Sequence, residues 1–147
     1  MRIVLVALLA VLTACSDDGL SKEEFIAQAD AICEAADEKT RELEPPKSPD
    51  ALTEFVVEAQ EITAQLLSDL RELQPPEEDR AVIDTMLSKI EEAMSYLPQI
   101  RDAAQKRDLQ EVSRLGEELQ AAASEANETA REYGLERCGR AQPAAAP

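Results

Sequence analysis

The sequence predicts an all-α protein, an antiparallel four-helix bundle with up-down-up-down topology. Four segments carry apolar residues at the three- and four-residue spacing of helices that bury one face. The proline pairs Pro45-Pro46 and Pro75-Pro76 and the glycine Gly134 mark helix ends. Strand signals are lacking, because only four glycines occur and no run alternates β-branched or aromatic residues with polar ones. Long helices joined by short corners favour a bundle.

The first helix is expected to begin after Ser21. Ser21 and Glu24 have the spacing of a capping box, in which each side chain bonds the other's backbone N–H. Leu20 and Phe25 flank this cap as a hydrophobic staple. Proline lacks the N–H donor and disfavours helix before it, so the helix ends ahead of Pro45. Its apolar stripe is Phe25, Ala29, Ile32, Ala36 and Leu43.

The second helix is expected to begin at Ser48-Pro49-Asp50. Proline suits the first turn of a helix, and an acidic residue there complements the helix dipole. Pro75-Pro76 ends this helix in the same way as the first. Its apolar stripe is Leu52, Phe55, Val56, Ala59, Ile62, Leu66, Leu70 and Leu73.

The third helix is expected to follow the acidic run Glu77-Glu78-Asp79. Pro98 falls inside the helical pattern, where its ring clashes with the carbonyl of the preceding turn, so it should kink or split the helix. The apolar stripe is Ile83, Met86, Leu87, Ile90, Met94, Leu97 and Ile100.

The fourth helix is expected to begin at Asp108, with Glu111 three residues later as in a capped N-terminus. Gly134 should end it in a left-handed conformation, and Leu135 can then complete the hydrophobic contact of that cap. The apolar stripe is Leu109, Val112, Leu115, Leu119, Ala122, Ala126, Ala130 and Tyr133.

The N-terminal residues have the pattern of a targeting signal. A basic Met1-Arg2 precedes the apolar run from Ile3 to Leu12, which is too short for the roughly 20 residues that span a bilayer. The sequence Leu12-Thr13-Ala14-Cys15 that follows resembles the lipobox of bacterial lipoproteins. The resemblance implies cleavage before Cys15 and attachment of a diacylglycerol, with acyl chains such as palmitate, to its sulfur.

This pattern predicts the domain organisation and the localisation. We expect a signal peptide over 1–14, a lipidated tether over 15–20, the helical domain over 21–138 and a disordered tail over 139–147. Because two acyl chains anchor a protein stably, the mature chain should be extracytoplasmic and held on the cell membrane. Its membrane partner is therefore the lipid bilayer itself.

The charge balance excludes one class of partner. The chain carries a formal charge of −16, and loss of Arg2 with the signal peptide leaves 14 basic against 31 acidic residues, a charge of −17. No basic stripe offsets this charge along the sequence. Such a surface repels the phosphate backbone, so we expect no nucleic-acid partner.

The three cysteines divide between two roles. Cys15 takes the lipid, which leaves Cys33 and Cys138 as a pair in an oxidising compartment. We expect one disulfide between them, closing a loop of about 105 residues. The alternative is two buried or reactive thiols. The chain contains no histidine, so neither a His-activated thiol nor a zinc site of mixed Cys and His ligands can form.

The sequence predicts no catalytic residue, cofactor or metal site. A histidine-based nucleophile pair cannot be built, and neither a glycine-rich phosphate loop nor EF-hand spacing occurs. The acidic runs Asp17-Asp18, Glu23-Glu24 and Glu77-Glu78-Asp79 lie where helices begin and complement the helix dipole. Tyr96 and Tyr133 are expected at the edge of the core. We therefore expect a protein that is not an enzyme.

The mature chain also resembles a group of small proteins. Phe25, Ala29 and Cys33 on the first helix, the Pro-Pro corners, and the closing Tyr-Gly-x-x-x-Cys-Gly from Tyr133 to Gly139 are similar to small helical actinobacterial lipoproteins and secreted domains of uncharacterised function. The resemblance implies no known activity and no catalytic residues.

Two functions therefore stay open from the sequence. The first is a cell-envelope lipoprotein that binds a protein partner of unknown identity through its helical surface. The second is a small-molecule or ion-binding lipoprotein, accessory to transport, with unknown ligand-binding residues in a crevice between helices. The small number of aromatic residues, two Phe and two Tyr, favours the first.

Overall fold

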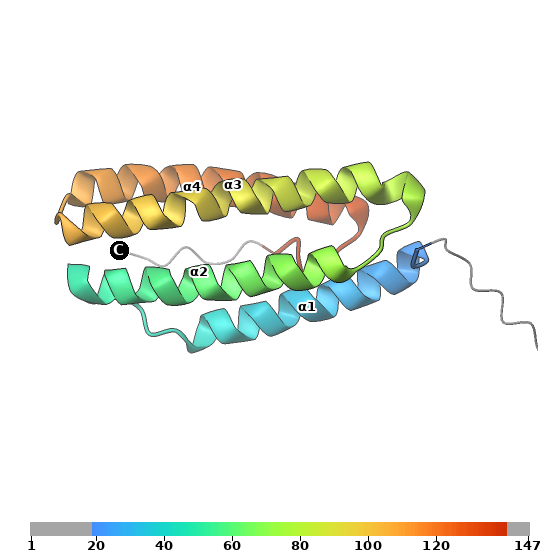
Figure 1. Cartoon of the computed structure of the whole chain (residues 1–147), viewed down its shortest axis with the longest axis horizontal. Helices are drawn as coiled ribbons and strands as arrows, with labels where there is room; N and C mark the ends of the chain where they lie inside the picture. Colours follow the sequence, from blue (N-terminus) through green and yellow to red (C-terminus); the bar gives the residue numbers. More distant parts are fainter. Residues whose placement is uncertain (1–18, 141–147) are drawn as a thin grey trace, which may run out of the picture.

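The computed structural model describes residues 19–140 and confirms the four-helix bundle (Figure 1). Each long helix runs antiparallel to the next along the chain, and no strand occurs within the described residues. A single turn of 3-10 helix, η1, precedes the third long helix. The elements are α1 (Lys22–Glu42), α2 (Pro49–Glu72), η1 (Glu77–Asp79), α3 (Arg80–Gln105) and α4 (Leu109–Tyr133).

Three of the helices begin at the caps that the sequence predicts. Ser21 and Glu24 form both bonds of the capping box, and the hydrogen bonds from Ser21 lower the pKa of Glu24. The Ser48 hydroxyl accepts from the N–H of Ala51 at 3.1 Å. The Asp108 carboxylate accepts from the N–H of Glu111 at 3.1 Å. Local sequence thus specifies where these helices begin.

The predicted end of α4 is also confirmed. Gly134 has φ 110°, which places it in the left-handed region, and its N–H and that of Leu135 both bond to the carbonyl of Ala130. Leu135 is fully buried beneath the end of the helix. The cap therefore turns the chain back toward α1.

The core consists of two clusters at opposite ends of the bundle. One cluster contains Phe25, Leu70, Met86, Tyr133 and Leu135 and draws on all four helices. The other contains Val56, Leu97, Ile100, Ala103 and Leu115, and its buried residues come from α2, α3 and α4 alone. The predicted stripes account for most of both clusters, so helical periodicity locates the core here.

Leu109 is the clear exception to the predicted stripes. We expected it in the core, yet 62% of its surface is exposed. It is the first residue of α4 and lies directly after the α3–α4 turn, where the chain reverses at the end of the bundle. Its exposure is therefore a result of its position at this end of the bundle rather than of helical register.

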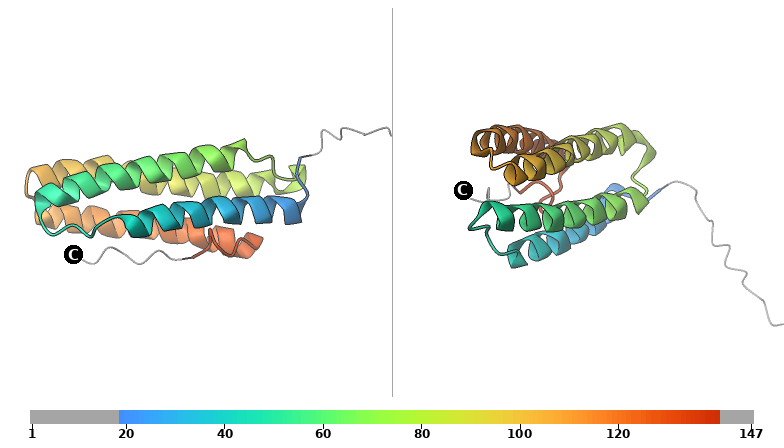
Figure 2. Two further views of the ribbon diagram at one scale, coloured as in Figure 1. Left: turned by 90° about the horizontal axis from the view of Figure 1, so that it is seen from below. Right: turned by 60° about the vertical axis from the view of Figure 1, so that its left-hand side comes forward.

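The helices pack in sequence order but do not close into a ring. α1 packs on α2, α2 on α3, and α3 most closely on α4, whereas no Cα atoms of α1 and α4 lie within 8 Å of each other. The segment after Gly134 turns back and lies beside α1 (Figure 2). This segment, rather than direct helix packing, joins α4 to α1.

Two further predictions concern α3 and the C-terminus. Pro98 does not split α3, which runs without interruption from Arg80 to Gln105. The kink at Pro98 stays a prediction.

The predicted tail began at Gly139, but Gly139 is buried, and a Cβ on it would lie 2.3 Å from the Arg131 side chain. The ordered domain therefore extends to Arg140 at least. Residues 1–18, on which the predictions of a signal peptide and of lipidation at Cys15 fall, and residues 141–147 lie outside the described residues.

Candidate functional site

The N-terminal segment is fixed to one end of the bundle, which we call the tether end (Gly19–Ser21, Gln74–Asp79 and Tyr133–Leu135). The N–H of Leu20 donates to the carbonyl of Gln74 at 2.8 Å. A Cβ at Gly19 would lie only 2.6 Å from the Pro75 carbonyl oxygen, so a larger residue could not approach the corner this closely. Gly19, the first described residue, is therefore held at this end of the bundle.

At the tether end, the Tyr133 side chain contacts both α1 and η1. Its hydroxyl donates to the Asp79 carboxylate at 2.8 Å, and its ring meets the edge of Phe25 with centroids 5.9 Å apart. The Lys22 ammonium lies 4.3 Å from the ring centroid. Burial and the Asp79 carboxylate raise the pKa of the Tyr133 phenol, which stays protonated and can donate. Tyr133 therefore lies within the buried cluster rather than at its edge, where we expected it, whereas Tyr96 is half-buried beside the second cluster.

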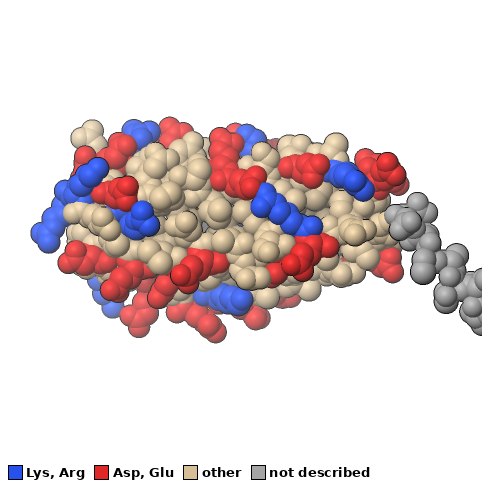
Figure 3. All heavy atoms as spheres, viewed as in Figure 1, with Lys and Arg blue, Asp and Glu red and all other residues tan. Residues whose placement is uncertain are grey.

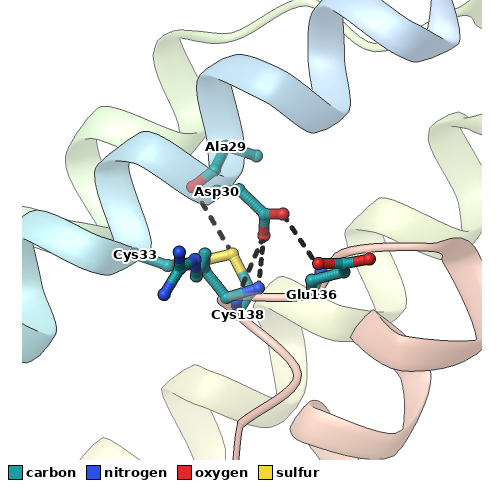
Figure 4. The surroundings of a disulfide bond; sticks show 6 residues. Ala29, Asp30, Cys33, Glu136 and Cys138 are labelled. Carbon is teal, nitrogen blue, oxygen red and sulfur yellow. Dashed lines mark hydrogen bonds between the residues drawn. A yellow bond between two sulfur atoms is a disulfide. The ribbon is translucent and has the colours of Figure 1, made fainter.

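The predicted disulfide between Cys33 and Cys138 is present (Figure 4). The two Cα atoms are 5.2 Å apart, within the range that a disulfide can bridge. The chain reaches Cys33 because residues 135–138 fold back along α1. The alternative of two separate thiols is therefore wrong.

Asp30 is a second attachment point for this segment, and the sequence analysis missed it. Its carboxylate accepts from the backbone N–H groups of Glu136, Arg137 and Cys138 at 3.0, 2.7 and 3.3 Å (Figure 4). These donors follow the end of α4 and have no helical partners. No sequence signal pairs them with Asp30, since more than 100 residues separate them. We call Asp30, Cys33 and residues 135–138 the C-terminal clasp.

Replacing Asp30 with alanine should weaken the clasp measurably. Three backbone donors would lose a charged acceptor in a half-buried place, so we expect the free energy of unfolding to fall by about 1–3 kcal/mol. Urea unfolding followed by circular dichroism measures this change. Glu34→Ala is the matched control, because Glu34 contacts the same segment only through an exposed ion pair with Arg137 and should cost less than about 1 kcal/mol. Equal losses in the two variants would contradict this role of Asp30.

An open groove lies at the tether end between the last turn of α2 and the first half of α3. Its volume is about 600 Å³, its floor includes Leu70 and Ile83, and Arg71 and Glu91 form an ion pair at its side. Arg80, also in the lining, has no side-chain partner among the described residues. The volume of the groove would accommodate a small polar molecule.

No cluster of metal-ligating side chains is present within residues 19–140. No group of three His, Cys, Asp or Glu side chains lies close enough to hold a metal ion there, and no polar side chain in this part of the chain is buried. None of the described helices is long and apolar enough to cross a membrane. Comparison of the chain with protein-family models, with curated proteins and with solved structures finds no match.

Proposed function

We propose that this protein is a non-enzymatic lipoprotein of the cell envelope, a helical protein-interaction module held by Cys15 on the outer side of the membrane. The observation that carries the proposal is the fixed position of Gly19 and Leu20 at the tether end. Leu20 bonds to Gln74, and Gly19 packs against Pro75. The four residues from Ser16 to Gly19 span at most about 14 Å, so a lipid on Cys15 would hold this end close to the bilayer.

The character of the domain supports an interaction role. Its core is apolar throughout the described residues, and its charged side chains lie at the surface. A packed core without convergent polar groups offers little for chemistry but forms a rigid support for a binding surface. Rigid helices lose little conformational freedom when a partner docks, which favours binding.

The anchor is tested by changing Cys15. In the native host, Cys15→Ala should abolish processing and lipidation, because only the cysteine sulfur can accept the diacylglycerol. Intact-mass analysis should detect the added lipid mass on the mature chain with its natural sequence. The same analysis should find no added lipid mass on the Cys15→Ala variant. Ser16→Ala is the control and should be processed normally. If the chain with its natural sequence is cut at another position and carries no lipid, the proposal is refuted.

The α2–α3 groove favours a second candidate function, binding of a small molecule or ion as an accessory to transport. A volume of about 600 Å³ falls within the range of ligand pockets, although this groove is partly open to solvent. A thermal-shift screen of residues 20–140 against metals, lipids and envelope metabolites discriminates the two functions. A large, saturable shift with one compound would favour this second function.

A further inference from the structure

Two corners of the bundle share a sequence, but the described chain covers only one of them. Arg-Glu-Leu-x-Pro-Pro occurs at residues 41–46, where α1 ends, and again at residues 71–76, where α2 ends. We call residues 43–46 the outer corner and residues 73–76 the tether corner, which is part of the tether end.

The backbones of the two corners are also alike. φ and ψ are −66° and 131° at Leu43, and −73° and 139° at Leu73. The N–H of each leucine bonds to the carbonyl three residues earlier at 3.3 Å. Each proline pair then fixes its own φ and keeps the preceding residue extended. The outer corner and the tether corner therefore present similar extended backbones to their surroundings.

The tether corner shows what such a backbone binds. The N–H of Leu20 donates to the carbonyl of Gln74 at 2.8 Å. A Cβ on Gly19 would lie 3.0 Å from the Gln74 carbonyl oxygen and 2.6 Å from that of Pro75, so only glycine fits there. The Leu20 side chain, like that of Leu73, packs against the buried cluster. The tether corner thus accepts a glycine that is followed by an aliphatic residue.

The outer corner has the same groups, and they are unused among the described residues. No backbone hydrogen bond there involves residues 44–47, so the Glu44 carbonyl, equivalent to the one that Leu20 uses, stays available. Pro45 is exposed, whereas the equivalent proline of the tether corner is half-buried. Leu43 is half-buried but packs against neither cluster of buried residues. The acceptor, the proline and the leucine of the docking geometry are therefore all accessible.

The surface around the outer corner determines the charge of a suitable partner. α1 has seven acidic and three basic residues, and α2 has six acidic residues and one basic residue. Figure 3 shows acidic side chains, in red, spread over the lower half of the molecule, where these two helices lie. Such a surface attracts a basic segment and repels an acidic one.

The position of the outer corner suits an external partner. α1 has 21 residues, which separates this corner from the tether end by about 31 Å. Figure 1 shows the connection between α1 and α2 on the outside of the bundle. If the proposed anchor holds the tether end at the bilayer, a protein in the cell envelope could reach the outer corner without contacting lipid.

We propose that the outer corner is a docking site for an extended, basic segment of another protein in which a glycine precedes an aliphatic residue. The N–H of the aliphatic residue would donate to the Glu44 carbonyl, its side chain would contact Leu43, and the glycine would lie against Pro45. Because the prolines fix the corner before binding, little conformational freedom is lost when the segment docks. The proposal rests on the proposed protein-interaction function and specifies its partner, whereas the chemistry of the corner does not depend on Cys15.

A peptide titration tests the chemistry of the outer corner. The probe is a fluorescent peptide, Lys-Lys-Gly-Leu-Ser-Lys, added to the full-length chain in phosphatidylcholine nanodiscs, whose neutral lipid does not attract it. Fluorescence anisotropy should show weak but saturable binding. The same peptide with valine in place of glycine should bind at least about tenfold more weakly, because a Cβ collides with the corner. Equal binding of the two peptides would overturn the proposal without any change to the protein itself.

Leu43→Ala is the variant that locates the binding site. Leu43 lies outside both buried clusters, so the domain should still fold, and the melting temperature is measured alongside. We expect about a tenfold loss of peptide affinity, as for one hot-spot residue. Leu109→Ala is the matched control, the same change at an exposed leucine, and should leave the affinity unchanged. An unchanged affinity in Leu43→Ala would show that the peptide binds elsewhere.

Photo-crosslinking in intact cells of the native host identifies the partner. The probe p-benzoylphenylalanine replaces Lys47, which is exposed beside the outer corner, and the control probe replaces Glu117, which is exposed on α4. The expected product joins position 47, but not position 117, to another protein at a basic segment with glycine before an aliphatic residue. A product at position 117 alone, a second copy of this chain, or a segment without that pattern would overturn the docking site but leave the interaction function standing. No product at either position would contradict both.

Discussion

Replacing both Cys33 and Cys138 with serine is expected to lower the free energy of unfolding by about 4 kcal/mol. The disulfide joins residues separated by 105 positions, so its loss returns a large loop-closure entropy to the unfolded chain. For a domain of this size the total stability is about 5–15 kcal/mol, and the change would remove a large part of it.

The disulfide also has a local consequence that follows from the packing order of the helices. α1 packs on α2, and its only link to α4 beyond side-chain contacts is the C-terminal clasp. Without the disulfide, α1 should therefore open more readily than α3 and α4, which pack closely together. Hydrogen exchange should show the greatest loss of protection in α1.

Urea unfolding and hydrogen exchange of the soluble domain, residues 20–140, measure both effects. The control is the unmodified domain treated with a reductant, which should match the double serine variant because both lack the bridge. A double variant that loses less than about 1 kcal/mol would contradict the entropic role of the disulfide. Uniform loss of protection across all four helices would contradict the local role in holding α1.

The parts of this fold that follow from the sequence depend on neighbouring residues. The capping box of Ser21 and Glu24 needs a spacing of three residues, and the cap at Gly134 needs one glycine followed by an apolar residue. Apolar periodicity then marks the buried face of each helix. Such signals are visible in a single sequence because the interacting groups are only a few residues apart. The disulfide across 105 positions could be predicted only because Cys33 and Cys138 are the two cysteines that remain once Cys15 is assigned to the lipid.

The parts that could not be predicted depend on contacts between distant residues or on the ends of elements. Asp30 bonds to a segment more than 100 residues away, and Tyr133 bonds to Asp79 across 54 positions. Leu109 fits the helical stripe of α4 but projects past the point where the bundle ends. Arg107 adopts the backbone of a glycine, and nothing in its residue type indicates that. Neither the exposure of Leu109 nor the backbone of Arg107 was therefore recognisable from the sequence.

Replacing Phe25 with alanine is expected to destabilise the domain by about 3–5 kcal/mol. Phe25 is completely buried, and it lies in the cluster that draws on all four helices. The loss combines the transfer of the ring from water with the cavity it would leave. The surrounding Leu70, Met86 and Leu135 are themselves nearly or fully buried, and they come from different elements, so they cannot collapse easily into the space.

Phe55→Ala is the matched control because it makes the same chemical change at the only other phenylalanine in the chain. Phe55 is half-buried on α2 and lies outside the two clusters of buried residues. Less apolar surface is lost there and no closed cavity forms, so the cost should be clearly smaller than at Phe25. Urea unfolding of both variants under the same conditions gives the comparison.

The aromatic pair of Phe25 and Tyr133 should contribute a measurable coupling within this loss. The rings meet edge to face with centroids 5.9 Å apart, and they connect α1 to α4, two helices whose backbones do not touch. A double-mutant cycle of Phe25→Leu and Tyr133→Leu should give a coupling free energy of about 0.5–1.5 kcal/mol. Additive losses in the cycle would mean that the clasp, and not this ring contact, holds α1 against α4.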